Sequence, residues 1–493
     1  AGERRRRDEQ DMFTVPNFLP FKKKGKHVEQ KVTFLELFSD LTFVVAIHNV
    51  AVPLEEEPNP FEAHLLVYTL RVFLLWMVWY SGTLLTNIGN LFVEGSDEMR
   101  PRHYCVVVFQ MTLMTLISQA TTSEEDMNVL ILFLVARIGL WLGLFYESRL
   151  ARPLDMTKGR YANIEGLVTK QGITLVVEIP LLGAAAYYCN AAGDASFKSL
   201  AIWAVYCVSI STLRLFGAAN IDKTSKAAAE KAAEKKAIAL PKTVLPKKIE
   251  LPNIYFSKKD SKKEEEEKEE DQALDLDTFA ERHDLIMLIF TGELLFAAAV
   301  PGSRYTTLCT IATATTIFFL FFVARPAERE LPWMISGFRG VVSAHLHFLI
   351  FAALPGIGAG FGRLTHAAAH GAHGEEHGRA LEEAQSDSTL LMPALEDKGC
   401  IAARLLVFGS AGFLLFSAIL IATGQDSEAA PVTFSLRARI SMRLFVTVAT
   451  VGLLALPCAQ WSIVPLAVPV IMMLAVGVEL KGITPKAATK ELI

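Results

Sequence analysis

Apolar runs of about 20 residues recur along the whole chain, and each is as long as a helix must be to cross a hydrocarbon core of about 30 Å. The chain is 52% hydrophobic and contains 31 Phe. This composition excludes a pair of ordinary soluble domains. The sequence therefore predicts an all-α polytopic membrane protein with about twelve transmembrane helices. The runs lie near 32–52, 61–86, 103–122, 127–147, 164–188, 197–217, 281–300, 304–325, 338–361, 400–423, 440–458 and 461–480.

A charged segment separates these runs into two six-helix halves. It contains Lys and Glu runs and a basic stretch with spaced prolines, a composition typical of a solvated linker. Both halves open with Phe-x-Glu and carry an ionisable residue twelve positions later, which indicates a parallel internal repeat. The expected parts are a basic tail at 1–31, a first half at 32–217, the linker at 218–278, a second half at 279–480 with an outer His-rich loop at 362–399, and a C-terminal tail at 481–493.

The charges between the runs indicate which side of the membrane each loop faces. Bases such as Arg149, Lys158 and Arg437 fall in loops that the helix count places on one side. Loops on the other side are mostly poor in Lys and Arg and include the acidic run 55–57. Because Lys and Arg are retained on the cytosolic side of membranes, we expect both termini on that side.

The first apolar run carries ionisable groups that are costly in lipid. Glu36 and Asp40 lie one helical turn apart on the same stripe, and His48 follows two turns later. An ionisable residue inside a membrane is by default a functional candidate. The structural alternative is that Asp40 pairs with Arg71 or Arg137 and ties helices together. Glu293 occupies the corresponding depth in the second half, so Glu293 and His48 are the stronger pathway candidates.

Further charged residues fall inside apolar runs of the first half. Arg71, Arg137 and Glu178 suggest a buried charge network or a cavity that accommodates an anion. Lys170 and Arg214 lie near the inner ends of their helices, where a long side chain can carry its charge to the interface. We expect these last two to do so.

Histidines gather in two places in the second half. His345 and His347 face different sides of one helix, so each is expected to be hydrogen-bonded within its own surroundings. The outer loop holds four more, whose spacing would suit a metal if the segment were helical, although interspersed glycines argue against a helix. These weak metal candidates are His366, His370, His373 and His377.

The first run also carries two family resemblances. Its sequence Glu-Leu-Phe-Ser-Asp-Leu-Thr-Phe-Val at 36–44 resembles the signature that opens the bacterial low-temperature-requirement A (LtrA) proteins. Arg71 with Trp76 and Trp79, the Glu-Arg-His at 281–283 and the Ala-His-Leu at 344–346 extend the resemblance over nearly the whole membrane portion. The segment Phe38-Ser39-Asp40 also resembles the motif of the endolysosomal potassium channels, whose first helices line the pore.

Recognisable nucleotide-binding loops, hydrolase triads, Cys-x-x-Cys pairs and nucleic-acid modules do not occur in the sequence. We therefore expect no enzyme activity, no cofactor, no nucleic-acid partner and no disulfide framework. The leading hypothesis is a transporter that moves a small ion or solute across the lipid bilayer. Its pathway candidates are Glu36, Phe38, Ser39, Asp40, His48, Glu281, His283, Asp284 and Glu293, and its charge-network candidates are Arg71, Arg137, Glu178 and His345.

Two other functions remain open at this point. A potassium-channel-like protein would need a water-filled axis along the first and seventh helices, with Ile47 at its narrowest point. A non-conducting subunit of a larger complex would instead use the tail 1–31 and the linker 218–278 to bind protein partners.

Overall fold

A computed structural model describes most of the membrane portion of the chain. The described residues are 34–56, 61, 64–93, 100–123, 125–151, 158–189, 196–216, 276–299, 304–323, 337–377, 388–423 and 436–482. Within these ranges every regular element is a helix and none is a strand. The prediction of an all-α fold is confirmed.

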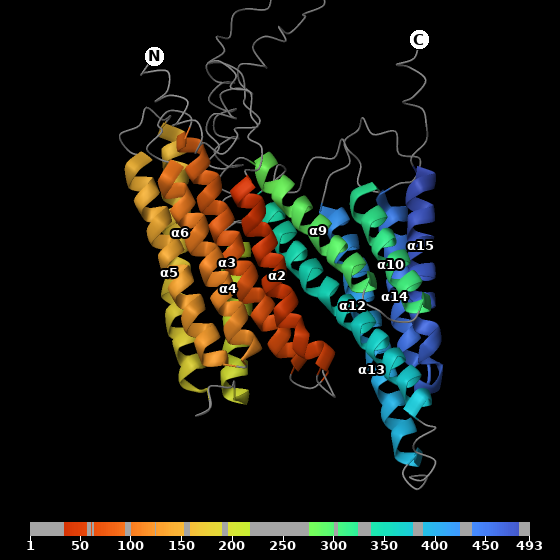
Figure 1. Cartoon of the computed structure of the whole chain (residues 1–493). Coiled ribbons are helices and arrows are strands. Elements are labelled where there is room, and N and C mark those ends of the chain that lie inside the picture. Colours follow the sequence, from red (N-terminus) through yellow and green to blue (C-terminus); the bar gives the residue numbers. More distant parts are fainter. Residues whose placement is uncertain are drawn as a thin grey trace, which may run out of the picture.

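The helices follow the apolar runs in chain order (Figure 1). In the first half they are α2 (Phe34–Glu56), α3 (His64–Val93), α4 (Arg100–Thr122), α5 (Asp126–Ala151), α6 (Lys158–Tyr187) and an unlabelled helix at Phe197–Phe216. In the second half they are α9 (Leu276–Ala299), α10 (Arg304–Phe318) with the π-helical turn η1 (Phe319–Val323), α12 (Gly337–His377), α13 (Ser388–Thr423), α14 (Leu436–Gly452) and α15 (Val464–Gly482), with short 3-10 turns η2 (Leu453–Ala455) and η3 (Cys458–Ile463) before α15.

Eleven of the described helices are long and apolar enough to cross a membrane, which confirms a multi-pass membrane protein. The twelfth expected span, α9, differs from the others in its charge. Arg282, Asp284 and Glu293 fall within any 18-residue stretch of this helix, whereas the eleven candidates hold at most two charged residues in a stretch of that length. Charged residues at membrane depth need partners, so the contacts of α9 with its neighbouring helices are of particular interest.

Two expectations about the region where α12 ends and α13 begins are wrong. The segment expected to be a loop at 362–399 is largely helical, since α12 continues to His377 and α13 begins at Ser388. Cys400 of α13 forms a disulfide. Sequence spacing carries no signal for a pair of cysteines that only the fold brings together.

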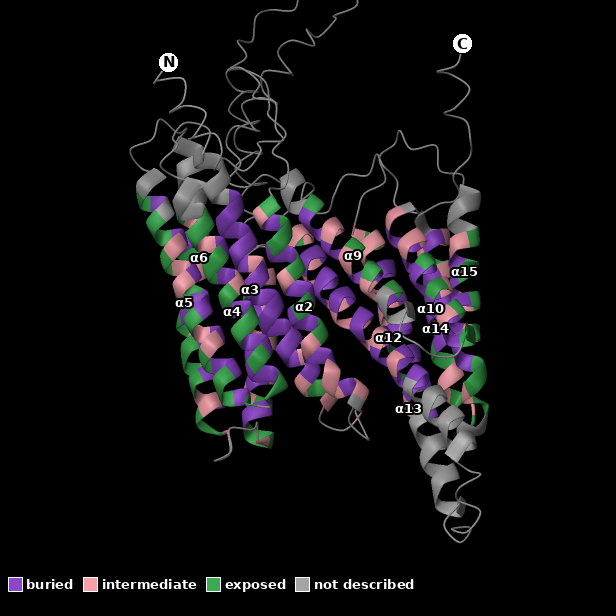
Figure 2. Ribbon diagram, in the orientation of Figure 1, coloured by how far each residue is buried: buried purple, intermediate pink, exposed green. Residues whose placement is uncertain are grey.

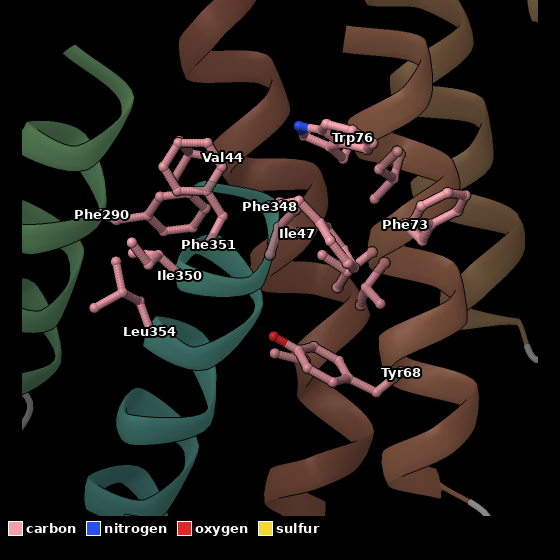
Figure 3. Packing of buried hydrophobic residues seen from close by; sticks show 14 of the residues in the cluster. Val44, Ile47, Tyr68, Phe73, Trp76, Phe290, Phe348, Ile350, Phe351 and Leu354 are labelled. Atoms are coloured by element: carbon pink, nitrogen blue, oxygen red, sulfur yellow. The ribbon is translucent and has the colours of Figure 1, made fainter. Parts of the chain in front are cut away.

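The two halves meet along α2, α9 and α12, which lie side by side, with the remaining helices of each half on either side of them (Figure 1). Buried residues concentrate there and on α3 (Figure 2). Figure 3 shows Phe290 of α9 and Phe351 of α12 together, with Val44 and Ile47 of α2 beside them. The rings of Phe290 and Phe351 stack with centroids 5.6 Å apart. A continuous apolar cluster thus joins the halves.

Helices α12 and α13 approach each other at the level of their backbones. A Cβ on Gly409 would lie 2.7 Å from Cγ1 of Ile357 and 2.8 Å from the carbonyl oxygen of Ala353. A Cβ on Gly360 would lie 2.9 Å from the backbone nitrogen of Leu406. Small residues permit this close packing, on which helix association in lipid depends.

Replacing Gly409 with Val is expected to destabilise the protein by about 1–3 kcal/mol, because the new side chain forces α12 and α13 apart. Unfolding in detergent, followed by loss of helical signal, measures the change. The matched control is Gly477→Val, since a Cβ at Gly477 meets nothing within 4 Å. Equal destabilisation by both variants would show that the α12–α13 contact is not tightly packed.

Candidate functional site

Asp40 sits at the centre of a buried polar network between the two halves. Its carboxylate receives two bonds from Arg282 of α9, from Nη2 at 2.5 Å and from Nε at 3.2 Å. The indole nitrogen of Trp79 on α3 donates to the same carboxylate at 2.7 Å. Arg282 also donates to Thr86 at 3.0 Å, and its Nη1 lies 3.9 Å from Glu36. We call these five residues the Asp40 network.

Charge and hydrogen bonding are well matched within the Asp40 network. Asp40, Glu36 and Arg282 are all buried, with 0–1% of each exposed. A two-pronged contact between a guanidinium and a carboxylate is among the strongest hydrogen-bonded pairs in proteins. The Arg282 guanidinium also lies over the Trp79 ring at 5.7 Å. The network therefore ties α2 and α3 of the first half to α9 of the second.

Histidines and aromatic rings surround the Asp40 network. The His283 ring lies 5.0 Å from that of Trp79 and 4.9 Å from that of His347. Nδ1 of His347 contacts the carbonyl oxygen of Ser343 at 2.8 Å, and Nδ1 of His345 contacts that of Val341 at 2.7 Å. The prediction that each histidine of this pair is hydrogen-bonded separately is confirmed.

The expected partners of the first-half arginines are wrong. Arg71 binds Asp126 through Nη2 at 2.7 Å and Nε at 3.0 Å. Arg137 binds Glu178 through two bonds of 2.9 Å. Neither arginine holds Asp40, because both pairs are internal to the first half. Arg137 and Glu178 form one buried pair, whereas Arg71 pairs with Asp126 separately.

Lys170 and Arg214, both expected to carry their charge to the membrane interface, behave differently. Lys170 is exposed, as expected for a side chain that carries its charge outward. Arg214 does not: its guanidinium carbon lies 5.0 Å from the Tyr80 ring centre and 5.9 Å from that of Trp76. The favourable contact between a guanidinium and aromatic faces explains why this side chain turns inward.

A second contact between the halves joins His48 of α2 to Glu293 of α9. Nδ1 of His48 and Oε1 of Glu293 lie 2.5 Å apart, and the side chains are 52% and 26% exposed. Unlike the Asp40 network, this pair is open to its surroundings. His48 lies eight residues beyond Asp40, which is about 12 Å farther along the helix.

The remaining pathway candidates do not converge on one site. Phe38 is 48% exposed, Glu281 is exposed and Asp284 is half-buried. Ser39 is buried, and its hydroxyl has no hydrogen-bond partner among the described residues. Thus the three residues of the Phe-Ser-Asp motif have three different environments.

The weak metal candidates, His366, His370, His373 and His377, lie outside the residues whose side chains the structure describes. Among those that it does describe, no group of three or more His, Cys, Asp or Glu residues could hold a metal ion. The tail 1–31 and most of the linker 218–278 also lie outside the described residues, so the prediction that they bind protein partners stays a prediction.

Sequence reasoning missed Arg282 as the partner of Asp40. In the structure, Asp40 and Arg282 each stand six residues after the start of their helices, at Phe34 and Leu276. The sequence pattern placed the start of the seventh run near 281, so it did not show this shared depth. In two helices that start on the same side of a membrane, equal offsets mean equal depth. A buried carboxylate needs a cation at its own depth, and α9 provides one.

Residues 31–478 match a family model described as bacterial low temperature requirement A protein (LtrA). Comparison with the curated proteins gives no match, and neither does comparison with the solved structures.

Proposed function

Because the chain belongs to the low-temperature-requirement A family of multi-pass membrane proteins, we propose that it moves a small ion or solute across the bilayer in a proton-dependent way. The observation that carries the proposal is the His48–Glu293 pair, which joins the two halves while remaining partly exposed. Ionisable side chains at membrane depth are costly and mark pathways and proton relays. Packing alone does not explain this pair, since apolar residues would join α2 and α9 as well.

The pair can respond to protonation. Histidine is the side chain whose charge ordinarily changes near neutral pH. A protonated His48 attracts an ionised Glu293, and loss of either charge weakens the contact. The other ionisable groups coupled to the pair are Glu55 of α2, which acts electrostatically on His48, and Tyr68 of α3, on which Glu293 acts. Proton binding would therefore change how firmly α2 and α9 are held together.

The Asp40 network supports a movement of one half against the other. It fixes α2 to α9 through buried, fully paired charges, whereas His48 and Glu293 form a weaker contact about 12 Å farther along. Holding two helices firmly at one level and loosely at another favours rocking about the firm level. Ile47 is fully buried in the apolar cluster. This burial favours a transporter whose halves move against each other, and it argues against a water-filled channel lined by Ile47.

Replacing Glu293 with Gln is expected to lower proton-coupled flux by about tenfold or more, because the variant loses the charge that His48 attracts. His48→Gln is expected to remove the pH dependence of whatever flux remains. Purified protein in liposomes, with an enclosed pH-sensitive dye, would be given gradients of Na⁺, K⁺, chloride and lactate in turn. The matched control is Glu165→Gln, which changes an exposed carboxylate on α6. Absence of wild-type flux under every gradient would overturn the proposal, as would full activity in Glu293→Gln.

A further inference from the structure

Arg214 is a cation of the first half that no carboxylate among the described residues binds. Its contacts are the faces of Tyr80 and Trp76. Its Nη2 nitrogen is buried and has no hydrogen-bond partner among the described residues. Arg214 is half-buried, and the buried part of a charged group is normally hydrogen-bonded, because an isolated charge is costly in a medium of low polarity. The described part of the chain therefore supplies no partner for the Nη2 nitrogen of Arg214.

The charge balance around Arg214 is positive. The ionised groups that act on it are Arg137 and Glu178, and these two neutralise each other through two bonds of 2.9 Å. Adding Arg214 leaves one positive charge over. The tyrosines nearby, Tyr80 and Tyr206, are neutral at physiological pH. An anion is what this part of the first half lacks.

Two more polar atoms close to Arg214 are buried without partners. One is the indole nitrogen of Trp76, whose side chain is fully buried and which is labelled in Figure 3. The other is Nε2 of His345 on α12, a residue whose ring centre lies 5.2 Å from that of Trp76. Arg214 also acts electrostatically on His345. Arg214 and His345, on two different helices, thus both lie against the Trp76 ring of a third, and each of the three side chains has a buried polar atom without a partner among the described residues.

The three atoms differ in what they can bind. Arg214 and Trp76 offer N–H donors only. Nδ1 of His345 contacts the carbonyl oxygen of Val341, so Nδ1 carries the proton and Nε2 of the neutral ring is an acceptor. The set therefore consists of two donors, one of them charged, and one acceptor. A halide satisfies the donors but offers nothing to Nε2 of His345.

We propose that Arg214, Trp76 and His345 form a binding site for a small oxyanion that carries a hydroxyl group, such as lactate or bicarbonate. The anionic oxygens receive hydrogen bonds from Arg214 and Trp76, and the hydroxyl group donates to Nε2 of His345. Tyr80 forms an aromatic wall beside the guanidinium. Binding is a property of these residues alone, whereas the further step, that this oxyanion is the transported solute, rests on the function proposed above.

Equilibrium binding tests the site directly. The probes are lactate, bicarbonate, acetate and chloride, titrated into purified protein in phosphatidylcholine nanodiscs and followed by calorimetry. Lactate and bicarbonate are expected to bind saturably, acetate about tenfold more weakly for want of a hydroxyl group, and chloride more weakly still. Trp76→Phe, which keeps the ring but removes the donor, is expected to weaken lactate binding by about tenfold.

The arginine variants form a matched pair. Arg214→Leu is expected to abolish lactate binding, whereas Arg149→Leu should leave it unchanged. Arg149 also lies over an aromatic ring, that of Phe145 at 4.9 Å, but is exposed. Replacing His345 with Phe should remove the preference for lactate over acetate while some binding of both persists. These patterns separate a ligand site from a purely structural contact between a cation and aromatic rings.

Three outcomes would overturn the site: no saturable binding of any probe, unchanged binding in Arg214→Leu, or equal affinity for chloride and lactate. Nanodiscs with an added anionic phospholipid distinguish a free oxyanion from a lipid headgroup. Competition by the lipid would assign the site to the headgroup and contradict the proposal. Lactate binding without lactate flux in liposomes would overturn the transport function and leave the binding site standing.

Discussion

Replacing Asp40 with Ala is expected to destabilise the folded protein by about 3–5 kcal/mol, because it leaves the buried Arg282 without its principal counter-charge. Trp79 and Arg282 also lose the acceptor for three hydrogen bonds between them. Glu36 compensates only in part, since its carboxylate lies 3.9 Å from Nη1 of Arg282. Equilibrium unfolding in mixed detergent micelles, monitored by circular dichroism, measures the change.

Two further variants show whether the charge or the packing is responsible. Glu36→Gln removes the more distant carboxylate and is expected to destabilise the protein by less than half as much as Asp40→Ala. The double variant Asp40→Leu with Arg282→Met removes both charges, and it should recover most of the lost stability because no ion is left buried. An additive effect of the two changes would show that the pair contributes no coupling energy.

The helical fold could be predicted almost entirely from the sequence. Lipid imposes one strong requirement, a run of about 20 apolar residues for each span, and such runs are visible without any tertiary information. The apolar pattern is a weaker guide where a helix carries several charged residues. The histidine-bearing end of α12 and the charged α9 were the places where the sequence pattern and the structure differed most.

The ion pairs were harder to predict because they join residues that are distant in sequence. Asp40 and Arg282 are 242 positions apart, and the sequence of neither helix indicates that the other is its partner. The expected topology nevertheless contained useful information on depth. Arg71 stands near the start of α3, at the opposite end of the membrane from Asp40, so this pairing could have been excluded. The open environment of His48 and Glu293 depends on packing around them, which no local pattern encodes.

Replacing Glu178 with Leu is expected to destabilise the protein more than replacing Arg137 with Leu does. The first change leaves the buried Arg137 and the half-buried Arg214 without Glu178, the carboxylate that acts on both, and about 3–5 kcal/mol is expected for an uncompensated buried charge. The second change leaves Glu178 and Arg214, which act on each other electrostatically and can partly compensate. Both variants would be compared with the wild type by the same equilibrium unfolding.

Removing Arg214 as well tests why Glu178→Leu is expected to be more destabilising than Arg137→Leu. Arg214→Leu is expected to restore part of the stability of Glu178→Leu, because Arg137 is then the one unpaired cation of this group instead of one of two. Lys170→Leu should restore nothing, since Lys170 is exposed on α6. Equal destabilisation by the two first-half variants, without rescue by Arg214→Leu, would contradict this account of the charge balance.

The same charge balance links stability to ligand binding. If a hydroxyl-bearing oxyanion occupies the site at Arg214, it supplies the negative charge that Glu178→Leu removes. A ligand that binds only the folded state stabilises it by an amount that grows with its affinity, and two cations attract an anion more strongly than one. Lactate should therefore raise the unfolding midpoint of Glu178→Leu more than that of the wild type, and should not raise that of Glu178→Leu with Arg214→Leu. This ordering of three proteins distinguishes a site that binds an anion from a cation held only by aromatic rings.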